Sequence, residues 1–489
     1  MQTPQQTTTA SLRERYGPRY RWLVLATVMV GLVASIISST IVNVAVPDMS
    51  HHFMLGQERA QWIATSFMIA TTLALPLTPS LLKRFGLRRV FMAGVTMLAI
   101  GGLAGGLSNR FELMIAARVL EGFSAGLLQP IPNIVILRAF ASEEQGRAMG
   151  LFGMGVVLAP ALGPTVGGML VEAFGWRSIF FFVVPPCALA FWFARRFLPT
   201  ISSFTSPAAG RFDWTGTAVL SAAILLLLNG LVSVHHGVVD ASSLLLPGLL
   251  LLAGFIWLQS RHAHPLVDIR LFDRRVFRLG AVVGFVYGIG VFGSTYLLPV
   301  FLQMGLGYSP SVAGAALFPG GIALALALYV TGRLVDRLSP QRLLFAGTLV
   351  FAVSIGVMAT VSAATPYALI LVWIVLGRIG LGMILPSLTL SVTRGLDRDE
   401  IPQAASITSL LRQFGGAAGV ATVGLLLEWR LGAAGFTVDS LVPAAGAATS
   451  VALVRAFEET FGLLMLLTMP AVLAAWLMAR ASRTRSGRD

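Results

Sequence analysis

Gly-Val-Val-Leu-Ala-Pro-Ala-Leu-Gly-Pro-Thr-Val-Gly-Gly, residues 155–168, places four glycines and two prolines inside one apolar segment. That segment runs from about residue 147 to residue 171, long enough to cross a bilayer. Gly and Pro break helices in water, but a membrane helix tolerates them where neighbouring helices bury the freed backbone. Small residues also recur at every fourth position, which lets a second helix approach closely: Gly155, Ala159, Gly163 and Gly167. The segment therefore predicts a kinked helix packed against a partner, either as a moving part of a transporter or as a structural close contact.

The whole chain has the composition of a polytopic membrane protein. Of its 489 residues, 56% are apolar and 11% are charged, which is too little polar surface to cover a soluble fold of this size. Apolar stretches of about 20 residues, bounded by charged or turn residues, predict fourteen membrane spans. They lie near 21–47, 61–82, 90–108, 111–137, 148–171, 176–197, 214–234, 244–260, 279–303, 311–332, 342–362, 366–391, 403–428 and 457–479. The first is preceded by arginines and has no small-residue cleavage site, so we expect it to be retained.

The basic residues predict the orientation of these spans. An even number of spans puts both termini on one side, and 27 of the 35 Lys and Arg residues fall on that side. Five fall on the other side and three within spans. By the positive-inside rule, both termini are expected in the cytoplasm, with the protein in the cell (inner or plasma) membrane. The net charge of +14 then belongs to the face near anionic lipid, and no nucleic-acid partner is needed to explain it.

Internal repeats predict two related halves around a site at the membrane midplane. The loop Pro-Ser-Leu-Leu-Lys-Arg-Phe-Gly-Leu-Arg-Arg at 79–89 resembles Gly-Arg-Leu-Val-Asp-Arg-Leu-Ser-Pro-Gln-Arg at 332–342. Gly126 and Pro130 in the fourth span also match Gly382 and Pro386 in the twelfth. We therefore expect a tail at 1–20, a six-helix bundle at 21–197, a linker with an inserted helix pair at 198–260, a second six-helix bundle at 261–479 and a tail at 480–489.

Five segments carry a resemblance to a known family. They are Ser-Thr-Ile-Val-Asn-Val-Ala-Val-Pro (39–47), the 79–89 loop, Arg-Val-Leu-Glu-Gly (118–122), the 155–168 run and Leu-Arg-Gln-Phe-Gly-Gly-Ala-Ala-Gly (411–419). Arg-Phe-Asp-Trp-Thr-Gly (211–216) and His-Pro-Leu-Val-Asp-Ile-Arg-Leu-Phe (264–272) add to it. The chain resembles the fourteen-span drug:proton antiporter branch of the major facilitator superfamily, of the EmrB/QacA type. The resemblance implies an all-α fold of two six-helix bundles plus an inserted pair, and export driven by proton entry.

The resemblance also assigns gating roles and shows two departures. The motif positions are Lys83, Arg84, Gly86, Arg88, Gly155, Pro160, Gly163, Pro164, Gly167, Gly168, Gly332, Asp336 and Arg337. Where the branch commonly has an Asp in span one, this chain has Ser38. Where the first loop commonly has an Asp, it has Lys83, although Asp336 fills the matching place in the second half. We therefore expect Asp336 to form the main cytoplasmic contact with the positive end of a neighbouring helix.

Glu121 is the acidic residue that the sequence places well inside a span. An ionisable side chain at that depth is costly unless it is paired, hydrated or protonated, so it is a functional candidate. Arg118 lies three residues earlier on the same helical face, close enough to pair with it. The branch often has Gln at position 121, so the acid has moved from span one to span four under this interpretation. Two readings stay open: Glu121 carries the coupled proton, or the pair only fixes helix packing.

Other polar residues predict the wall of a substrate cavity. Arg378 and Arg412 are the remaining arginines within spans; they lie either on the substrate path or near carbonyls and lipid headgroups. The expected cavity residues are Ser38, Thr40, Asn43, Gln129, Asn133, Tyr287, Tyr296, Gln303, Arg378, Arg412 and Gln413. Taken alone, each neutral one suits a helix–helix hydrogen bond better than a ligand contact. Three in-span arginines against one Glu favour neutral or weakly acidic substrates over permanent cations.

Several functions are excluded or disfavoured. The single lysine, Lys83, follows Leu82, so no Gly-Lys-Ser/Thr phosphate loop exists and the chain is not itself an ATP-driven pump. With Cys187 as its one cysteine, it has neither an intrachain disulfide nor a Cys-based zinc site. A His-Glu-x-x-His motif is absent, and Gly-Phe-Ser-Ala-Gly at 122–126 matches Gly-x-Ser-x-Gly only inside a predicted span, so we expect no enzyme activity. His51-His52 and His235-His236 suit solvated loops better than a shared metal site; we expect no metal and no cofactor beyond the proton gradient.

The sequence thus predicts a proton-coupled exporter of amphipathic or toxic small molecules. A dedicated exporter of one endogenous metabolite, such as a siderophore or natural product, is the second reading. A non-transporting receptor or scaffold is a third, which the glycine-rich spans and paired loops disfavour. The expected partners are the small-molecule substrate, protons and membrane lipid. The segment 430–456, the longest predicted external loop, is also able to dock a periplasmic adaptor.

Overall fold

The protein is all-helical in the computed structural model, which describes residues 9–55, 57–199, 213–233, 238–262, 265–362, 364–433 and 451–486; no strand occurs in these ranges. The first helices are α1 (Thr9–Tyr16), η1 (Gly17–Arg19), α2 (Tyr20–His52), α3 (Gln57–Ala74), η2 (Leu75–Leu77), α4 (Thr78–Gly106), α5 (Phe111–Leu128), α6 (Ile131–Ala139), α7 (Ser142–Phe174), α8 (Ser178–Phe182) and α9 (Val184–Phe197). The later ones are α10 (Trp214–Val232), α11 (Val238–Arg261), η4 (Ile269–Asp273), α12 (Arg275–Val300), η5 (Phe301–Gly305), α13 (Pro310–Val335), α14 (Pro340–Met358), α15 (Tyr367–Thr393), α16 (Ile401–Ala433) and α17 (Val451–Ser486).

Twelve of the described helical segments are long and apolar enough to cross a membrane, so the chain is a multi-pass membrane protein. One of the twelve, Trp62–Gly106, is 45 residues long and includes two of the spans expected from the sequence. Gly86 interrupts it with φ 78° and ψ 164°, a conformation that side chains with a Cβ rarely adopt. A further predicted span, on α5, carries Glu112, Arg118 and Glu121 and is not among the twelve.

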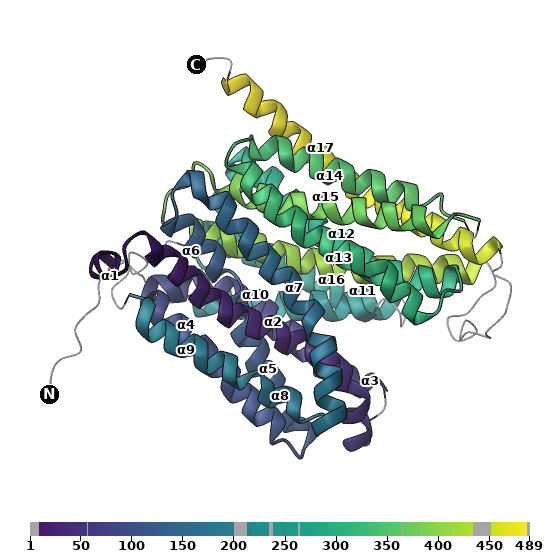
Figure 1. The fold of residues 1–489 in the computed structure, drawn as a ribbon, viewed down its shortest axis with the longest axis horizontal. Coiled ribbons are helices and arrows are strands. Elements are labelled where there is room, and N and C mark those ends of the chain that lie inside the picture. The colour runs from purple at the N-terminus through teal and green to yellow at the C-terminus, as the bar shows by residue number, and fades with distance from the viewer. Residues whose placement is uncertain are drawn as a thin grey trace.

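The helices form two groups, which Figure 1 shows in purple to blue and in green to yellow. The first helix group is α2–α9, whose apolar core includes Phe91, Ile134 and Val183. The second helix group is α12–α17, whose core includes Phe301, Phe457 and Phe461. Helices α7 and α13 pack against each other and form the largest contact between the groups. Large apolar side chains such as Phe318 and Leu473 are exposed on the outside, as expected of a surface in contact with lipid.

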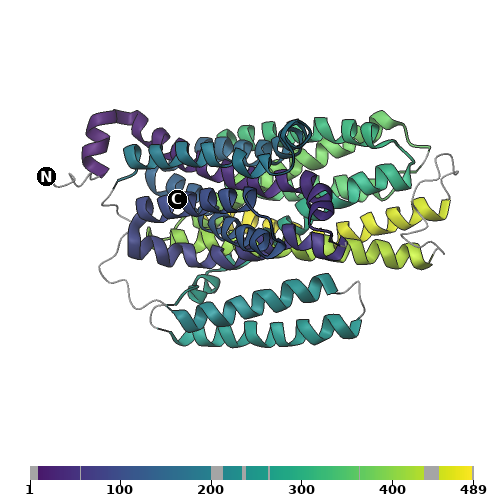
Figure 2. The ribbon, with the colours of Figure 1, turned by 90° about the horizontal axis from the view of Figure 1, so that it is seen from below.

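Helices α10 and α11 pack on each other and lie beside the two groups, at the bottom of Figure 2. A chain of hydrogen bonds fixes one end of this pair. Asp213 accepts from Gly216 N (2.7 Å) at the start of α10 and from Gln259 Nε2 (2.6 Å) at the end of α11. Gln259 Oε1 accepts from Leu266 N (2.6 Å), and Gln403 of α16 donates to Leu266 O (3.1 Å). The pair is therefore attached to the second helix group at this end.

The two ends of the molecule differ in how the helix groups meet. We call the end that carries α1 and the last turns of α17 the terminal end, on the left of Figure 1. There, α7 begins beside the last turn of α13, and Arg138 of α6 donates to Arg398 O and, at 3.3 Å, to Asp399 Oδ1. At the opposite end, Arg177 joins α8 to the connection between α4 and α5 through Asn109 (2.9 Å). The terminal end thus carries polar contacts between the two helix groups.

Candidate functional site

A buried ion pair lies in the middle of the first helix group. Arg118 Nη1 donates to Glu121 Oε2 at 2.6 Å, and both side chains are almost fully buried (1% and 0% exposed). The residues lie three apart on α5, a spacing that puts them on one helical face. Removing one partner of such a pair leaves an uncompensated buried charge, which lowers the stability of the fold by about 3–5 kcal/mol. The two groups therefore depend on each other.

Neighbouring helices satisfy the remaining capacity of Arg118. Its Nε donates to Ile63 O (3.0 Å) of α3, and its Nη1 also donates to Ser38 O (3.3 Å) of α2. The guanidinium carbon lies 4.4 Å from the centre of the Phe67 ring, which provides a cation–π contact. Three helices thus fix the position of this one cation.

Glu121 fits against α4 because glycines leave room for it. A Cβ at Gly101 would approach Glu121 Cγ to 2.5 Å, and a Cβ at Gly102 would approach Phe180 O of α8 to 2.9 Å. While Oε2 binds Arg118, Glu121 Oε1 is buried and has no hydrogen-bond partner among the described residues. Its side chain is closely packed, and one carboxylate oxygen keeps unused hydrogen-bonding capacity.

Ser38 lies at the Arg118–Glu121 pair. Its side chain is completely buried and stands beside the Glu121 carboxylate, and its carbonyl accepts from Arg118. Ser38 is the position where the resembled branch has an acid in span one. Residues 38 and 121 therefore both contact the Arg118 guanidinium, Ser38 through its backbone carbonyl and Glu121 through its carboxylate. Ser38 therefore lies in the packed interior next to the pair, and its expected cavity role stays a prediction.

The other expected cavity residues of the first group do not gather around one point. Thr40 bonds to carbonyls of its own helix, Ile36 O (3.2 Å) and Ile37 O (3.3 Å), and contacts Gly163 of α7. Asn43 is exposed on α2. Gln129 and Asn133, at the junction of α5 and α6, each have a buried amide oxygen without a partner in the described ranges. These two amides are polar groups that face into the protein and have spare capacity.

The glycine-proline run forms part of α7, one helix from Ser142 to Phe174 that packs along α2. A Cβ at Gly163 would meet Thr40, and one at Gly167 would come within 2.7 Å of Ile41 Cγ1. Gly155 faces Met29, whereas Gly168 has nothing within 4 Å. Pro160 is partly buried, and the side chain of Pro164 lies outside the described parts of the structure. The small residues of the run thus provide the close approach of α7 to α2.

In the second helix group, three expected residues lie on three helices that pack on one another. Tyr287 of α12 is close enough to Arg378 of α15 and Arg412 of α16 to interact electrostatically with both. Gln413 is partly buried beside Arg412 in sequence, while Tyr296 is 40% exposed and Gln303 bonds to Pro299 O (3.2 Å). The expected cavity set therefore separates into a tyrosine–arginine cluster and scattered residues.

Asp336 and Gly332 contact the start of α7 at the terminal end. Asp336 accepts hydrogen bonds from Gly146 N (2.8 Å) and Arg147 N (3.0 Å), in the first turns of α7. A Cβ at Gly332 would collide with the backbone of Gly146 and Gly150, so the helices touch backbone to backbone here. This arrangement places the Asp336 carboxylate at the positive end of a helix dipole. Arg337 is exposed next to it.

The matching loop of the first helix group lacks such a carboxylate. Lys83 is partly buried, Arg84 is exposed against the Phe85 ring, and Arg88 is partly buried. Gly86 supplies the positive φ at which the chain turns from one span into the next. The loops at 79–89 and 332–342 therefore differ in charge as expected, although their gating roles stay predictions.

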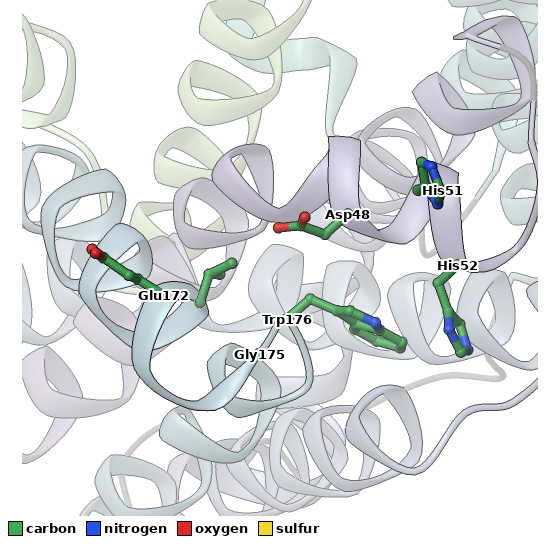
Figure 3. Close-up of a pocket in the computed structure, with 7 residues that line it drawn as sticks. Asp48, His51, His52, Glu172, Gly175 and Trp176 are labelled. Carbon is green, nitrogen blue, oxygen red and sulfur yellow. The ribbon is translucent and has the colours of Figure 1, made fainter.

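A surface pocket of about 550 Å³ opens at the opposite end, and Figure 3 shows its lining. It lies between Asp48, His51 and His52 of α2 and Glu172 and Trp176 near the end of α7. In Figure 3 the two carboxylates and the two imidazoles point to different sides and do not converge. No group of three His, Cys, Asp or Glu side chains within the described ranges is placed to hold a metal ion. His235 and His236 lie outside those ranges, as does most of the 430–456 loop.

Sequence patterns did not identify the residues that surround the pair or that receive Asp336. Ile63 contributes only a carbonyl, and Gly101, Gly146 and Gly150 contribute the absence of a side chain. Such contributions have no chemical signature in a glycine-rich membrane chain. A signal did exist for Asp213, which begins α10 within the Arg-Phe-Asp-Trp-Thr-Gly segment, but not for its partner Gln259.

Comparison with known proteins places the chain in a family. The family model of the Major Facilitator Superfamily matches residues 23–420. The multidrug resistance protein B homolog of Mycobacterium tuberculosis (strain CDC 1551 / Oshkosh) is 31% identical over 419 residues, which cover 83% of this chain and 76% of that protein. The lincomycin resistance protein LmrB of Listeria monocytogenes is 26% identical over 399 residues, covering 82% and 84% of the two chains.

A solved structure shows the same fold at low identity. A double-tryptophan variant of XylE superposes with a TM-score of 0.67 at 12% identity, over 94% of this chain and 96% of the XylE chain. At that identity the likeness concerns the fold alone. The family match, the relatives and the helical architecture agree. The chain is a multi-pass membrane transporter that belongs to the Major Facilitator Superfamily, and it is not an enzyme.

Proposed function

We propose that this transporter exports amphipathic or toxic small molecules in exchange for protons, with Glu121 as the proton carrier. The observation that carries the proposal is the buried Glu121 carboxylate with one oxygen on Arg118 and one without a protein partner. Among the described residues, Glu121 and Asp213 are the buried acids, and Asp213 is committed to the start of α10. A carboxylate at membrane depth is costly, and loading and releasing a proton is the function that such a group serves in many transporters. Relatives named for multidrug and lincomycin resistance agree with export.

The fourteen-span EmrB/QacA-type architecture is the second element of the proposal. The break at Gly86 divides the segment 62–106 into two passes, and α5 with α6 supplies one more across residues 111–139. Together with the other eleven candidate segments, this gives fourteen passes. Under this reading α10 and α11 are a helix pair inserted between two six-helix bundles, in keeping with their position beside both helix groups.

The terminal end is the cytoplasmic end in this proposal, because the excess of arginine falls there. In this orientation the membrane is the inner or plasma membrane, and the partners are the exported molecule, protons and lipid. An adaptor that docks on the 430–456 loop is compatible with the proposal in a double-membraned cell. The proton gradient drives transport in this proposal, and no bound cofactor is included.

Alternating access requires contacts that exist in one state and break in the other. Two sets of contacts join the helix groups at the terminal end: Asp336 and Gly332 with α7, and Arg138 with the 398–399 segment. Both sets would break if the helix groups separated at this end. We propose that this structure is the state closed at the terminal end, with Asp336 as the main charged contact there.

The test of the proposed function is uptake into proteoliposomes. In vesicles whose lumen is acidic, protein inserted with its terminal end outward should accumulate fluorescent amphipaths, and a protonophore should abolish the accumulation. A panel of neutral, anionic and cationic dyes shows which class is transported. Accumulation that persists after the pH gradient is collapsed would contradict proton coupling.

Asp336 should give the terminal contact a pH dependence. Burial raises the pKa of the Asp336 carboxyl above its ordinary value of 3.8, although the N–H groups of Gly146 and Arg147 and the charge of Arg394 act to lower it. A raised pKa means that the closed state binds the proton more tightly than a solvated state does, so the closed state gains stability as the pH falls through the raised pKa. Acidifying the terminal side from about pH 7 to about pH 4.5 should therefore favour closure.

The Asp336→Asn variant imitates the protonated carboxyl. It should shift the population between the two states at neutral pH, slow turnover, and lose most of the acid response. Labelling of a single cysteine at the opposite end, in a Cys187→Ala background, reads the population. Lys83→Asn, at the matching position of the other loop, should have the smaller effect. An acid response of equal size in Asp336→Asn would assign the response to groups other than Asp336.

A further inference from the structure

Two arginines of the second helix group lie at membrane depth without a carboxylate. Arg378 is close to the midpoint of α15, and Arg412 lies in the second third of α16. In the described ranges, neither forms an ion pair, and the neutral Tyr287 is the titratable side chain near each of them. Arg378 Nη1 donates one hydrogen bond, to Thr295 Oγ1 at 3.3 Å. Most of the donor capacity of the two guanidinium groups is therefore unused.

Arg118 provides the contrast within the same chain. It is matched by the Glu121 carboxylate, two backbone carbonyls and an aromatic ring. A guanidinium at the centre of a membrane helix costs about 2.5–3.5 kcal/mol on insertion scales, and it is rarely retained without a partner or a function. The first helix group supplies its arginine with a carboxylate partner, whereas the second leaves two arginines without one.

The surroundings of Arg378 are apolar on one side and polar on the other. A Cβ at Gly320 of α13 would lie 3.1 Å from Arg378 Cγ, so the methylene stem is held against that helix. Leu298, Phe351 and Ile374 line a small space that reaches Arg378. The guanidinium points the other way, toward the exposed Thr295 on α12. A ligand that meets this cation thus finds apolar side chains close by.

We propose that Arg378, Arg412 and Tyr287 form a binding site for the anionic head of an amphipathic molecule, that is, a carboxylate, sulfonate or phosphate group attached to an apolar body. Guanidinium groups present planar forks of donors that match such oxygen pairs, and the Tyr287 hydroxyl adds a further donor. This inference rests on the proposed export function, since it names the class of molecule that the transporter takes. The site is separate from the Arg118–Glu121 pair, so the two are tested independently.

The test measures equilibrium binding without any gradient, using two dyes that share one ring system. 1-Anilinonaphthalene-8-sulfonate carries a sulfonate that stays charged at all working pH values, and N-phenyl-1-naphthylamine is the same body without it. Fluorescence is recorded on the full-length protein in phosphatidylcholine nanodiscs, with empty nanodiscs as the baseline. Arg378→Gln and Arg412→Gln should each weaken binding of the sulfonate dye at least about tenfold, the loss expected for one charged hydrogen-bonded contact. Binding of the neutral dye should change less than about twofold.

Matched variants separate a site from a folding defect. Arg378→Lys keeps the charge and should retain part of the sulfonate affinity, while Arg333→Gln removes an exposed arginine stacked on Tyr329 and should change neither dye. Equal loss of both dyes in Arg378→Gln and Arg412→Gln would overturn the proposal, because it would indicate a packing role. Unchanged sulfonate binding would also overturn it.

Anionic lipid is the other source of the same chemistry. Repeating the titration in nanodiscs with phosphatidylglycerol distinguishes the two, because a soluble substrate should still bind with arginine-dependent affinity. If phosphatidylglycerol abolishes the arginine-dependent binding, the occupant is a lipid headgroup and the substrate proposal fails. Glu121→Gln should bind the sulfonate dye normally, so failure of proton coupling leaves this result readable.

Discussion

Replacing Glu121 by Gln should reduce pH-gradient-driven uptake to the level of empty vesicles while dye binding remains measurable. The variant removes the one buried acid in the described spans that is not committed to a helix start. Gln keeps an oxygen for Arg118 but carries no proton between states. Since the change also leaves Arg118 without its counter-charge, thermal unfolding must be recorded alongside, with a loss of up to about 3–5 kcal/mol expected.

Moving the carboxylate back to α2 should rescue this variant. Arg118 Nη1 already donates to the backbone carbonyl of Ser38 at 3.3 Å, and the Ser38 side chain lies beside the Glu121 carboxylate, so an Asp at position 38 would lie close to the same guanidinium. Ser38→Asp/Glu121→Gln should therefore recover gradient-driven uptake. Ser35→Asp/Glu121→Gln is the matched control, because Ser35 is also buried on α2 but lies one turn away. Normal uphill uptake by Glu121→Gln alone would remove Glu121 from the mechanism.

The single variant Ser38→Asp should behave differently again. Two carboxyl groups would then share one guanidinium. The repulsion between two carboxylates disfavours ionisation of both at once, but the site can hold more negative charge than it does with Ser38. Relative efflux of lipophilic cations should rise against that of anionic dyes. Unchanged relative efflux would mean that the charge at position 38 does not reach the transported molecule.

Gly332→Leu should abolish turnover without unfolding the protein. Its side chain would occupy space that the backbone of Gly146 and Gly150 fills in this structure, so the terminal end should no longer close. Because the helix groups can separate, the steric clash should destabilise the closed state and leave the folding of each group unaffected. Rotational freedom of side chains offers no relief, because the obstructing atoms are backbone.

The matched control is Gly321→Leu on the same helix, where nothing lies within 4 Å of the added Cβ. Labelling of a single cysteine at the opposite end should fall strongly in Gly332→Leu and stay normal in Gly321→Leu. Wild-type turnover in Gly332→Leu would show that α7 and α13 do not approach this closely during transport.

The sequence predicted the helical class, the family and the pairing of Arg118 with Glu121, because hydropathy and helical spacing depend on local order alone. It did not predict that Ser38 stands at that pair, since this requires knowing how α2 packs on α5. Nor did it predict the separation of Arg378 and Arg412 from any acid. Contacts made by carbonyls and glycines, such as Ile63 O and Gly101, leave no pattern in the chain. The inserted pair and the count of fourteen spans stay predictions.

The hydrogen-bonded chain from Asp213 through Gln259 to Gln403 makes the pair α10–α11 a natural reference frame for spectroscopy. Because these hydrogen bonds attach one end of the α10–α11 helix pair to α16, a probe on the outer surface of α11 should move with the second helix group. A second probe on α2 or α9 would then report the relative movement of the helix groups. The pair thus offers two lipid-facing helices for labelling, away from both the Arg118–Glu121 pair and the arginine cluster.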